Sequence, residues 1–158
     1  MQNIKNKLTD NIIAHVGYIV KDRETAVKRL SELYGITEWF WVDFRPFHTW
    51  TEGKEVDNYH LSCAISLPDE GTRLEVIQPI SEGFHMNMLK EGVQTISHIC
   101  YIVEDYDFYR NKYLGENTEL IFEAEAEDDE RGYRRCCYIY DCVLNTIIEF
   151  AEKPYFRK

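Results

Sequence analysis

A ten-residue segment occurs twice in this chain, and the two copies lie about half a chain length apart. Positions 13–22 read IAHVGYIVKD and positions 96–105 read ISHICYIVED, with identical residues at six of the ten places. The second copy begins 83 residues after the first in a chain of 158. This spacing is too long for a short-period solenoid and indicates two structural modules.

Both copies predict the same order of elements, a strand followed by a helix. β-Branched and aromatic residues dominate each copy, which is typical of a strand. The first copy leads into residues 22–35, which start with a helix-capping Asp22, carry apolar residues at helical spacing and stop at Gly35. Residues 105–115 repeat this plan. The strand-helix unit is therefore duplicated.

Three further strands are predicted after each helix, which makes the chain an α+β protein of two βαβββ modules. Turn signals at Pro68–Gly71 and Asp141–Cys142 separate the last two strands of each module. The acidic run from 123 to 130 is interpreted as a solvated loop. The predicted strands span residues 38–45, 59–67 and 72–79 in the first module, and 118–124, 133–140 and 144–151 in the second.

Length and composition predict one cytoplasmic domain that acts on small molecules. We expect a single domain over 1–158, with modules at about 11–79 and 96–151 and a linker at 80–95. A net charge of -10 argues against nucleic acid and anionic membrane surfaces as partners. No apolar run is long enough to span a bilayer or to act as an export signal. The five cysteines lack metal-binding spacing and are interpreted as small, mostly buried hydrophobes: Cys63, Cys100, Cys136, Cys137 and Cys142.

The repeat places a histidine at the same position of both modules. A single histidine on an apolar strand is more often a core residue than a metal ligand. Here His15 and His98 occupy equivalent sites, and the last predicted strand of each module adds a carboxylate between apolar residues, Glu75 and Glu149. A carboxylate that faces a sheet core needs a positive partner. The alternative, two carboxylates on the solvated faces of their strands, would need two coincidences.

Two imidazoles and two carboxylates form a ligand set for one divalent metal ion. This donor set suits Zn, Ni, Co, Mn or Fe(II), and open coordination positions would remain for water or substrate. The predicted metal ligands are His15, Glu75, His98 and Glu149.

Four motifs together resemble the vicinal oxygen chelate superfamily, also known as the glyoxalase/bleomycin resistance/dioxygenase superfamily. They are H-x-G-x-x-V-x-D, L-E-x-x-x-P, S-H-I-x-Y-x-V-x-D and I-I-E-F, and the likeness extends from about residue 13 to residue 151. Within the family, these motifs resemble those of glyoxalase I and methylmalonyl-CoA epimerase. The resemblance implies a cupped mixed sheet around the metal, with ligands from the first, fourth, fifth and last strands of the paired modules.

The leading functional hypothesis is a divalent-metal-dependent lyase or isomerase that moves a proton next to a metal-polarised carbonyl. Glu75 and Glu149 are its predicted catalytic residues. One alternative is an Fe(II) extradiol dioxygenase with two histidines and one carboxylate, which the fourth ligand argues against. The other is a non-catalytic binder of small molecules, which would need no metal ligands. A homodimer is also expected, because a second copy can cover the open edges of a cupped sheet.

Other residues have open interpretations. The aromatic segment 39–50 either walls a substrate pocket or packs against a helix or the other module. Four arginines are candidates to bind a substrate carboxylate: Arg45, Arg73, Arg134 and Arg135. Three histidines lack a repeat partner, so surface or supporting roles are expected for His48, His60 and His85.

Overall fold

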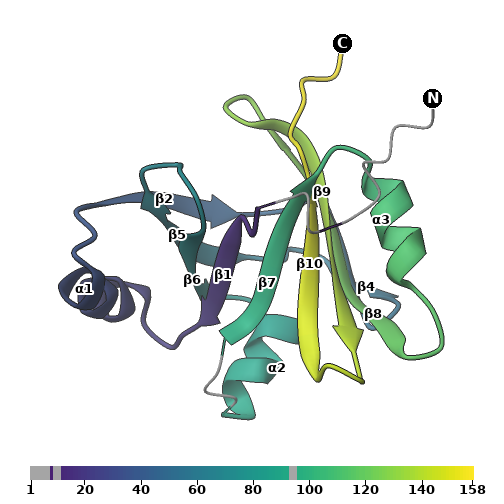
Figure 1. Cartoon of the computed structure of the whole chain (residues 1–158), viewed down its shortest axis with the longest axis horizontal. Helices are drawn as coiled ribbons and strands as arrows, with labels where there is room; N and C mark the ends of the chain where they lie inside the picture. Colours follow the sequence, from purple (N-terminus) through teal and green to yellow (C-terminus); the bar gives the residue numbers. More distant parts are fainter. Residues whose placement is uncertain (1–7, 9–11, 93–95) are drawn as a thin grey trace.

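The chain forms one mixed sheet of ten strands with three helices among the residues that the structure describes. The computed structural model describes residues 8, 12–92 and 96–158. The predicted module start at residue 11 and the end of the predicted linker at 93–95 lie outside these residues. The strand order across the sheet is β2-β5-β6-β1-β7-β10-β9-β8-β3-β4 (Figure 1). Within the described part, no helix is long and apolar enough to cross a membrane.

The predicted βαβββ order is present in both halves of the chain. The first half contains β1 (His15–Ile19), α1 (Arg23–Tyr34), β2 (Glu38–Phe44), β5 (Leu61–Leu67) and β6 (Arg73–Pro79), with β3 (His48–Thr51) and β4 (Lys54–Glu55) between β2 and β5. The second half contains β7 (Ile96–Val103), α3 (Tyr106–Tyr113), β8 (Thr118–Asp128), β9 (Gly132–Asp141) and β10 (Thr146–Glu152). A further helix, α2 (Phe84–Lys90), connects the halves.

The helix boundaries follow from capping residues that the repeat places alike. The side chain of Asp22 accepts a hydrogen bond from the backbone N–H of Thr25, and Asp105 accepts one from Phe108 in the same way. These bonds satisfy backbone donors that the first turn of a helix leaves free. Gly35 ends α1 in the left-handed conformation, at φ 67°, which glycine adopts at low cost.

The two halves join through β1 and β7, the strands that carry the repeated segment. These strands pair antiparallel, while β6 pairs parallel to β1 and β10 pairs parallel to β7. The first strand of each half is therefore flanked by the last strand of its own half and by the first strand of the other. The two halves are therefore related by a pseudo-twofold axis, as expected for two copies of one module. Helices α1 and α3 lie at opposite sides of the molecule (Figure 1).

Side chains alternate between the two faces of each strand, so the buried residues form two hydrophobic clusters under the helices and a third on the inner face of the curled sheet. Ala64 and Val76 pack with Val27 of α1, and Cys137 and Ile139 pack with Tyr109 of α3. The neighbouring residues on the other face of the sheet form the inner cluster, which joins the two halves: Tyr59, Leu61, Cys63, Ile77, Ile121, Phe122, Ala124 and Tyr138. Because successive side chains of a strand point to opposite faces, each half has both a helix-covered face and an inner face.

The sheet is strongly curled, because its two ends are joined by a very short segment. Strand β2 lies at one end of the sheet, and β3 pairs with β8 near the other end. Only residues 45–47 separate them, so the end of β2 and the start of β3 are at most about 15 Å apart. The ten strands therefore form a half-barrel, in agreement with the cupped sheet that the resemblance implies.

One expectation about local structure was wrong, and two elements were not predicted. The acidic run 123–130 is not a solvated loop, because β8 continues to Asp128 and buries Ala124 and Ala126 against β9. Alternation explains this, since the acidic side chains take the outer positions of a paired strand. The expected linker contains α2, and the β3–β4 hairpin was not predicted.

Candidate metal centre

Strand register brings the predicted ligands together in two rows that cross the middle of the sheet. In one row, Gly17 of β1 lies between Glu75 of β6 and His98 of β7. In the other row, Cys100 of β7 lies between Glu149 of β10 and His15 of β1. Each row therefore contains a glutamate, a small residue and a histidine, and the small residues are themselves repeat equivalents.

The donor atoms of the four predicted ligands converge on one point. His15 Nε2 lies 3.2 Å from His98 Nε2, 3.0 Å from Glu75 Oε2 and 3.1 Å from Glu149 Oε2. His98 Nε2 lies 3.2 Å and 3.0 Å from the same two oxygens. All four atoms lie within 4.8 Å of one another. We call these residues the four-donor cluster: His15, Glu75, His98 and Glu149.

This geometry fits a shared cation better than pairwise hydrogen bonds. An imidazole nitrogen carries at most one proton, which points in one direction. Yet each Nε2 atom has three polar neighbours at hydrogen-bond distance. Adjacent ligands on an octahedral ion with bonds of about 2.1 Å lie about 3.0 Å apart, close to the observed spacing. The residues present therefore fit a divalent ion.

A hydrogen-bond chain orients His98 toward the centre of the cluster. The Ser97 hydroxyl lies 3.1 Å from the carbonyl oxygen of Gly17, to which it donates, and 2.8 Å from His98 Nδ1. Since the hydroxyl proton is used on the carbonyl, the hydroxyl oxygen accepts the proton of Nδ1. Nε2 of His98 therefore presents its lone pair to the cluster, as a supporting hydrogen bond does for many metal-bound histidines.

Burial makes the charges of the cluster depend on each other. The side chains of His15, Glu149 and Glu75 are 10%, 9% and 14% exposed, and that of His98 is fully covered. Burial alone would lower the pKa of His15, but Glu75 and further neighbours outweigh it and hold that pKa well above its usual range. Burial alone would raise the pKa of Glu75, but His15 outweighs it and lowers that pKa. At Glu149, hydrogen bonds from His15 and His98 outweigh burial in the same way and lower the pKa. Both carboxyl groups are therefore anionic and suited to a cation.

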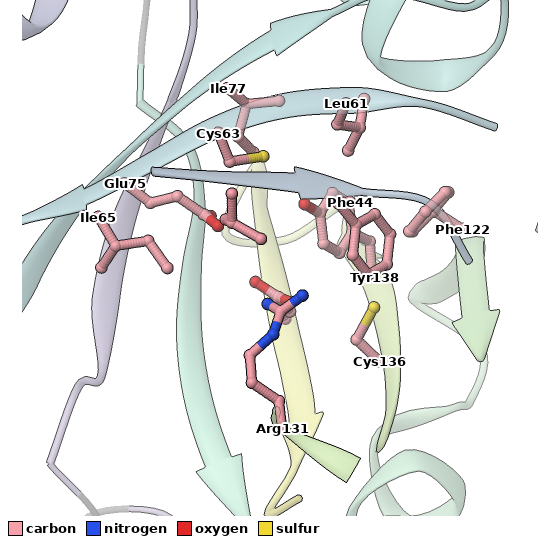
Figure 2. A pocket seen from close by; sticks show the side chains of 12 residues that line it. Phe44, Leu61, Cys63, Ile65, Glu75, Ile77, Phe122, Arg131, Cys136 and Tyr138 are labelled. Carbon is pink, nitrogen blue, oxygen red and sulfur yellow. The ribbon is translucent and has the colours of Figure 1, made fainter. Parts of the chain in front are cut away.

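An open pocket leads from the inner cluster to the metal ligands. Its cavity has a volume of about 80 Å³ and opens to solvent, and its walls are mostly apolar. Figure 2 shows Glu75 and Arg131 pointing into it from opposite sides. The lining residues come from β2, β5, β6, β8, β9 and β10, so both halves of the sheet contribute. Small organic molecules bind in pockets of this kind, with a few polar groups on apolar walls.

The cysteines near the pocket are neutral thiols. Cys63 and Cys136 line it, and burial raises the pKa of both thiols well above the usual range. Burial raises the pKa of Cys100 to about 12. Nucleophilic chemistry requires a thiolate, so these residues act as small buried side chains, as predicted. All five cysteines are free, and Cys142 alone is exposed.

The aromatic segment 39–50 has both of its expected roles. Trp39 packs with α1 and donates a hydrogen bond to the Ser31 hydroxyl at 2.8 Å. Val42 and Phe44 of the same strand line the pocket. The segment therefore forms one pocket wall and a helix contact.

Two residues that line the pocket, Arg131 and Tyr138, were not predicted from the sequence. None of the four candidate arginines lines the pocket, whereas Arg131, at the β8–β9 turn, does. His85, expected at the surface or in a supporting role, is fully buried and bonds the hydroxyls of Tyr59 and Tyr138. His48 is exposed and His60 pairs with Asp43 at 2.7 Å. The missed residues have no repeat equivalent of the same type, so the repeat carried no signal for them.

Solved structures with this fold include methylmalonyl-CoA epimerases. The enzyme from Mycobacterium tuberculosis has a TM-score of 0.62 and 16% identity, over 98% of this chain and 94% of its own. A variant from Streptomyces coelicolor, solved in complex with 2-nitronate-propionyl-CoA, has a TM-score of 0.59 and 16% identity, over 94% and 98%. A hypothetical protein from Bacillus halodurans C-125 has a TM-score of 0.59 and 15% identity, over 94% and 98%. At such identities, the likeness shows the fold alone.

A family model provides the assignment at the level of sequence. No curated protein sequence matches the chain. Residues 14–138 match the model of the Glyoxalase/Bleomycin resistance protein/Dioxygenase superfamily, and this range contains three of the four clustered residues. The match covers well over half of the chain and agrees with both the repeat and the half-barrel. The chain therefore belongs to the glyoxalase/bleomycin resistance/dioxygenase superfamily.

Proposed function

We propose that this protein is a divalent-metal-dependent enzyme that moves a proton on a carbon next to a carbonyl group, as an epimerase or a lyase. The observation that carries the proposal is the four-donor cluster at the end of an apolar pocket. Two carboxylates and two imidazoles meet there, and four protein ligands leave positions open on a six-coordinate ion. The epimerase structures that share the fold support this reaction class.

The chemistry divides between the ion and the two carboxylates. A divalent ion in the cluster would supply Lewis-acid polarisation of a substrate oxygen, which makes the neighbouring C–H bond more acidic. Glu149 and Glu75 come from equivalent strands of the two halves, so one can take a proton and the other can return it. A carboxylate close to cations has a lowered pKa, so it must move away from them to act as an effective base.

The pocket favours a substrate with an anionic group beside a short apolar part. Arg131 is the cation among the lining residues, with a side chain that is 28% exposed. One of its N–H groups donates to Asp128 Oδ2 at 2.9 Å, which holds the guanidinium at the turn, and the described residues offer no further acceptor to its other N–H groups. A carboxylate or phosphate group of the substrate would bind there. Acyl-CoA thioesters and thiol adducts of 2-oxoaldehydes are the compounds to test.

Solvent-proton exchange tests this function directly. The protein, loaded with each of Zn²⁺, Ni²⁺, Co²⁺ and Mn²⁺ in turn, is incubated in D₂O with methylmalonyl-CoA or with the hemithioacetal of methylglyoxal and glutathione. We expect metal-dependent deuterium incorporation at the carbon next to the carbonyl, followed by NMR. Absence of exchange with both compounds and all four ions, in protein shown to contain the ion, would contradict the proposal.

A further inference from the structure

A second buried polar group lies beside the four-donor cluster. His85 Nδ1 lies 2.7 Å from the hydroxyl oxygen of Tyr59, and His85 Nε2 lies 3.0 Å from the hydroxyl oxygen of Tyr138. The three residues are 0%, 2% and 4% exposed, so water does not replace these partners. Tyr138 also stacks on the ring of His98, with ring centroids 4.8 Å apart, and lines the pocket (Figure 2). The chain of hydrogen bonds therefore ends at the pocket.

The directions of these hydrogen bonds can be assigned from the number of protons. Burial lowers the pKa of His85 to about 3, so the ring is neutral and has one N–H group. The Tyr59 hydroxyl already accepts the backbone N–H of His85 at 3.2 Å, and the acceptor within its reach among the described residues is His85 Nδ1. The two hydrogen bonds to His85 use only two of the three protons of these groups, so one hydroxyl proton has no acceptor among the described residues. On Tyr59 that proton would be buried without a partner, whereas Tyr138 lines the pocket, so the spare proton is assigned to Tyr138.

The assignment then continues to the pocket. Because Tyr59 donates to Nδ1, the ring proton of His85 is on Nε2 and is donated to the Tyr138 oxygen. The hydroxyl proton of Tyr138 is consequently not used on His85. Among the described residues, no other hydrogen-bond partner of this hydroxyl is present. The proton is therefore available to a molecule in the pocket.

Strand register places Tyr138 next to one carboxylate of the cluster and breaks the pseudo-twofold. Tyr138 of β9 lies directly opposite Glu149 of β10. The equivalent position in the first half, opposite Glu75 of β6, is Ile65 of β5. Directly opposed residues of antiparallel strands point to the same face. The two carboxylates are thus equivalent in backbone position but differ in the residue opposite them, a tyrosine for Glu149 and an isoleucine for Glu75.

We propose that Tyr138 donates a hydrogen bond to an oxygen of the bound substrate, and that Tyr59 and His85 are positioning residues that fix the direction of its O–H bond. This inference rests on the proposed function. When a proton leaves the carbon next to a carbonyl, negative charge develops on the carbonyl oxygen. A donor that already points at that oxygen stabilises the charge without reorganisation. The hydroxyl also distinguishes the two oxygens of a chelating substrate. Tyr138, opposite Glu149, offers a hydrogen-bond donor, whereas Ile65, opposite Glu75, offers none.

The tautomer of His85 is the first test, and it needs no substrate. In protein with ¹⁵N-labelled histidine, with and without Zn²⁺, long-range ¹⁵N–¹H spectra distinguish protonated from unprotonated ring nitrogens. His85→Asn assigns the signals. We expect a protonated Nε2 and an unprotonated Nδ1. Tyr59→Phe removes the donor to Nδ1 and should shift the signals toward the other tautomer. A proton on Nδ1 in the unaltered protein would overturn the proposal.

The second test uses oxalate, a small dianion with two vicinal oxygens, as the probe. Calorimetry measures Zn²⁺ binding first and then oxalate binding to the zinc-loaded protein. We expect Tyr138→Phe to weaken oxalate binding about 10-fold to 100-fold, the usual effect of one hydrogen bond to a charged group, with Zn²⁺ affinity unchanged. Tyr140→Phe is the matched control, because Tyr140 lies on the same strand but bonds Asn145 at 2.8 Å and does not line the pocket.

The outcomes separate this inference from the proposed function. Unchanged oxalate affinity in Tyr138→Phe, with Zn²⁺ and oxalate bound normally by the unaltered protein, contradicts the role of Tyr138 alone. An unaltered protein that binds no divalent ion contradicts the proposed function, and this inference with it. Loss of affinity in Tyr138→Phe but not in Tyr140→Phe, together with the Nε2 tautomer, supports the proposal.

Discussion

At the scale of single residues, the cluster combines acid-base groups with ligand atoms in the same side chains. The Oε2 atoms of Glu75 and Glu149 each lie within 3.2 Å of Nε2 of His15 and Nε2 of His98. Each carboxylate is therefore placed to bind a cation as well as to move a proton. Whether the two carboxylates are catalytic stays a prediction. Substitutions that keep the oxygen donor but remove the charge separate the two roles.

We expect Glu149→Gln to lower turnover by roughly 10²-fold or more, the usual scale for the loss of a general base. Metal binding should weaken less than in His98→Ala, because the amide oxygen still occupies the ligand position. The solvent-exchange assay and calorimetry with Zn²⁺ measure the two effects. If Glu149→Gln and Glu75→Gln both keep near-full turnover with metal bound, the base is elsewhere. Glu52 and Glu55, which are exposed around the β3–β4 hairpin, are then the residues to test.

At the scale of elements, the close pairing of β1 and β7 depends on the glycine in H-x-G. A Cβ atom built on Gly17 would lie 2.1 Å from His98 Cε1 and 2.6 Å from both ring nitrogens. Such distances are far below van der Waals contact. The ring of His98 thus occupies the space that any other side chain at position 17 would need. At the equivalent position of β7, Cys100 is small and buried beside His15.

We expect Gly17→Ala to displace the His98 ring, lower the free energy of unfolding by about 1–3 kcal/mol and weaken Zn²⁺ binding. Urea denaturation of the metal-free protein measures the first effect, and calorimetry measures the second. Gly115→Ala is the matched control, because nothing lies within 4 Å of a Cβ atom there. Equal stability and equal Zn²⁺ affinity in the two variants would show that the contact between Gly17 and His98 is not as tight as described.

At the scale of the whole molecule, the four-donor cluster links the two halves of the chain. Each row of ligands takes its histidine from one half and its glutamate from the other. A bound ion therefore stabilises the association of the halves as well as its own site. Association into a homodimer stays a prediction, which light scattering at micromolar concentration would test. The half-barrel ends in strands β2 and β4, which have only one neighbour each within the chain.

We expect a divalent ion at about 100 times its dissociation constant to stabilise the fold by about 2.7 kcal/mol. For a protein of this size, this corresponds to a rise in melting temperature of roughly 5–10 °C. Calorimetric melting with Zn²⁺, and after treatment with a chelator, measures the difference. His98→Ala provides the control, since its melting should respond little to the ion. If the melting temperature of the unaltered protein is the same in both conditions, the cluster does not bind metal in the folded state.

The sequence by itself determined the repeated βαβββ elements and the cluster residues, because both are encoded locally and twice. Capping residues, strand periodicity and the repeated histidine act over a few residues, and the repeat doubles each signal. This is why the βαβββ order and the convergence of His15 and His98 with Glu75 and Glu149 were predictable.

Only the tertiary structure decided what surrounds the cluster. The curl of the sheet, the pairing of β3 with β8 and the helix between the halves depend on contacts between distant segments. Tyr138, His85 and Arg131 have no repeat equivalents of the same type, so no local sequence pattern identified them as part of the site. They join the site because strand register and burial bring residues 53 positions apart, such as His85 and Tyr138, into hydrogen-bond contact. Such long-range pairing is set by packing of the whole inner cluster, which no short segment encodes.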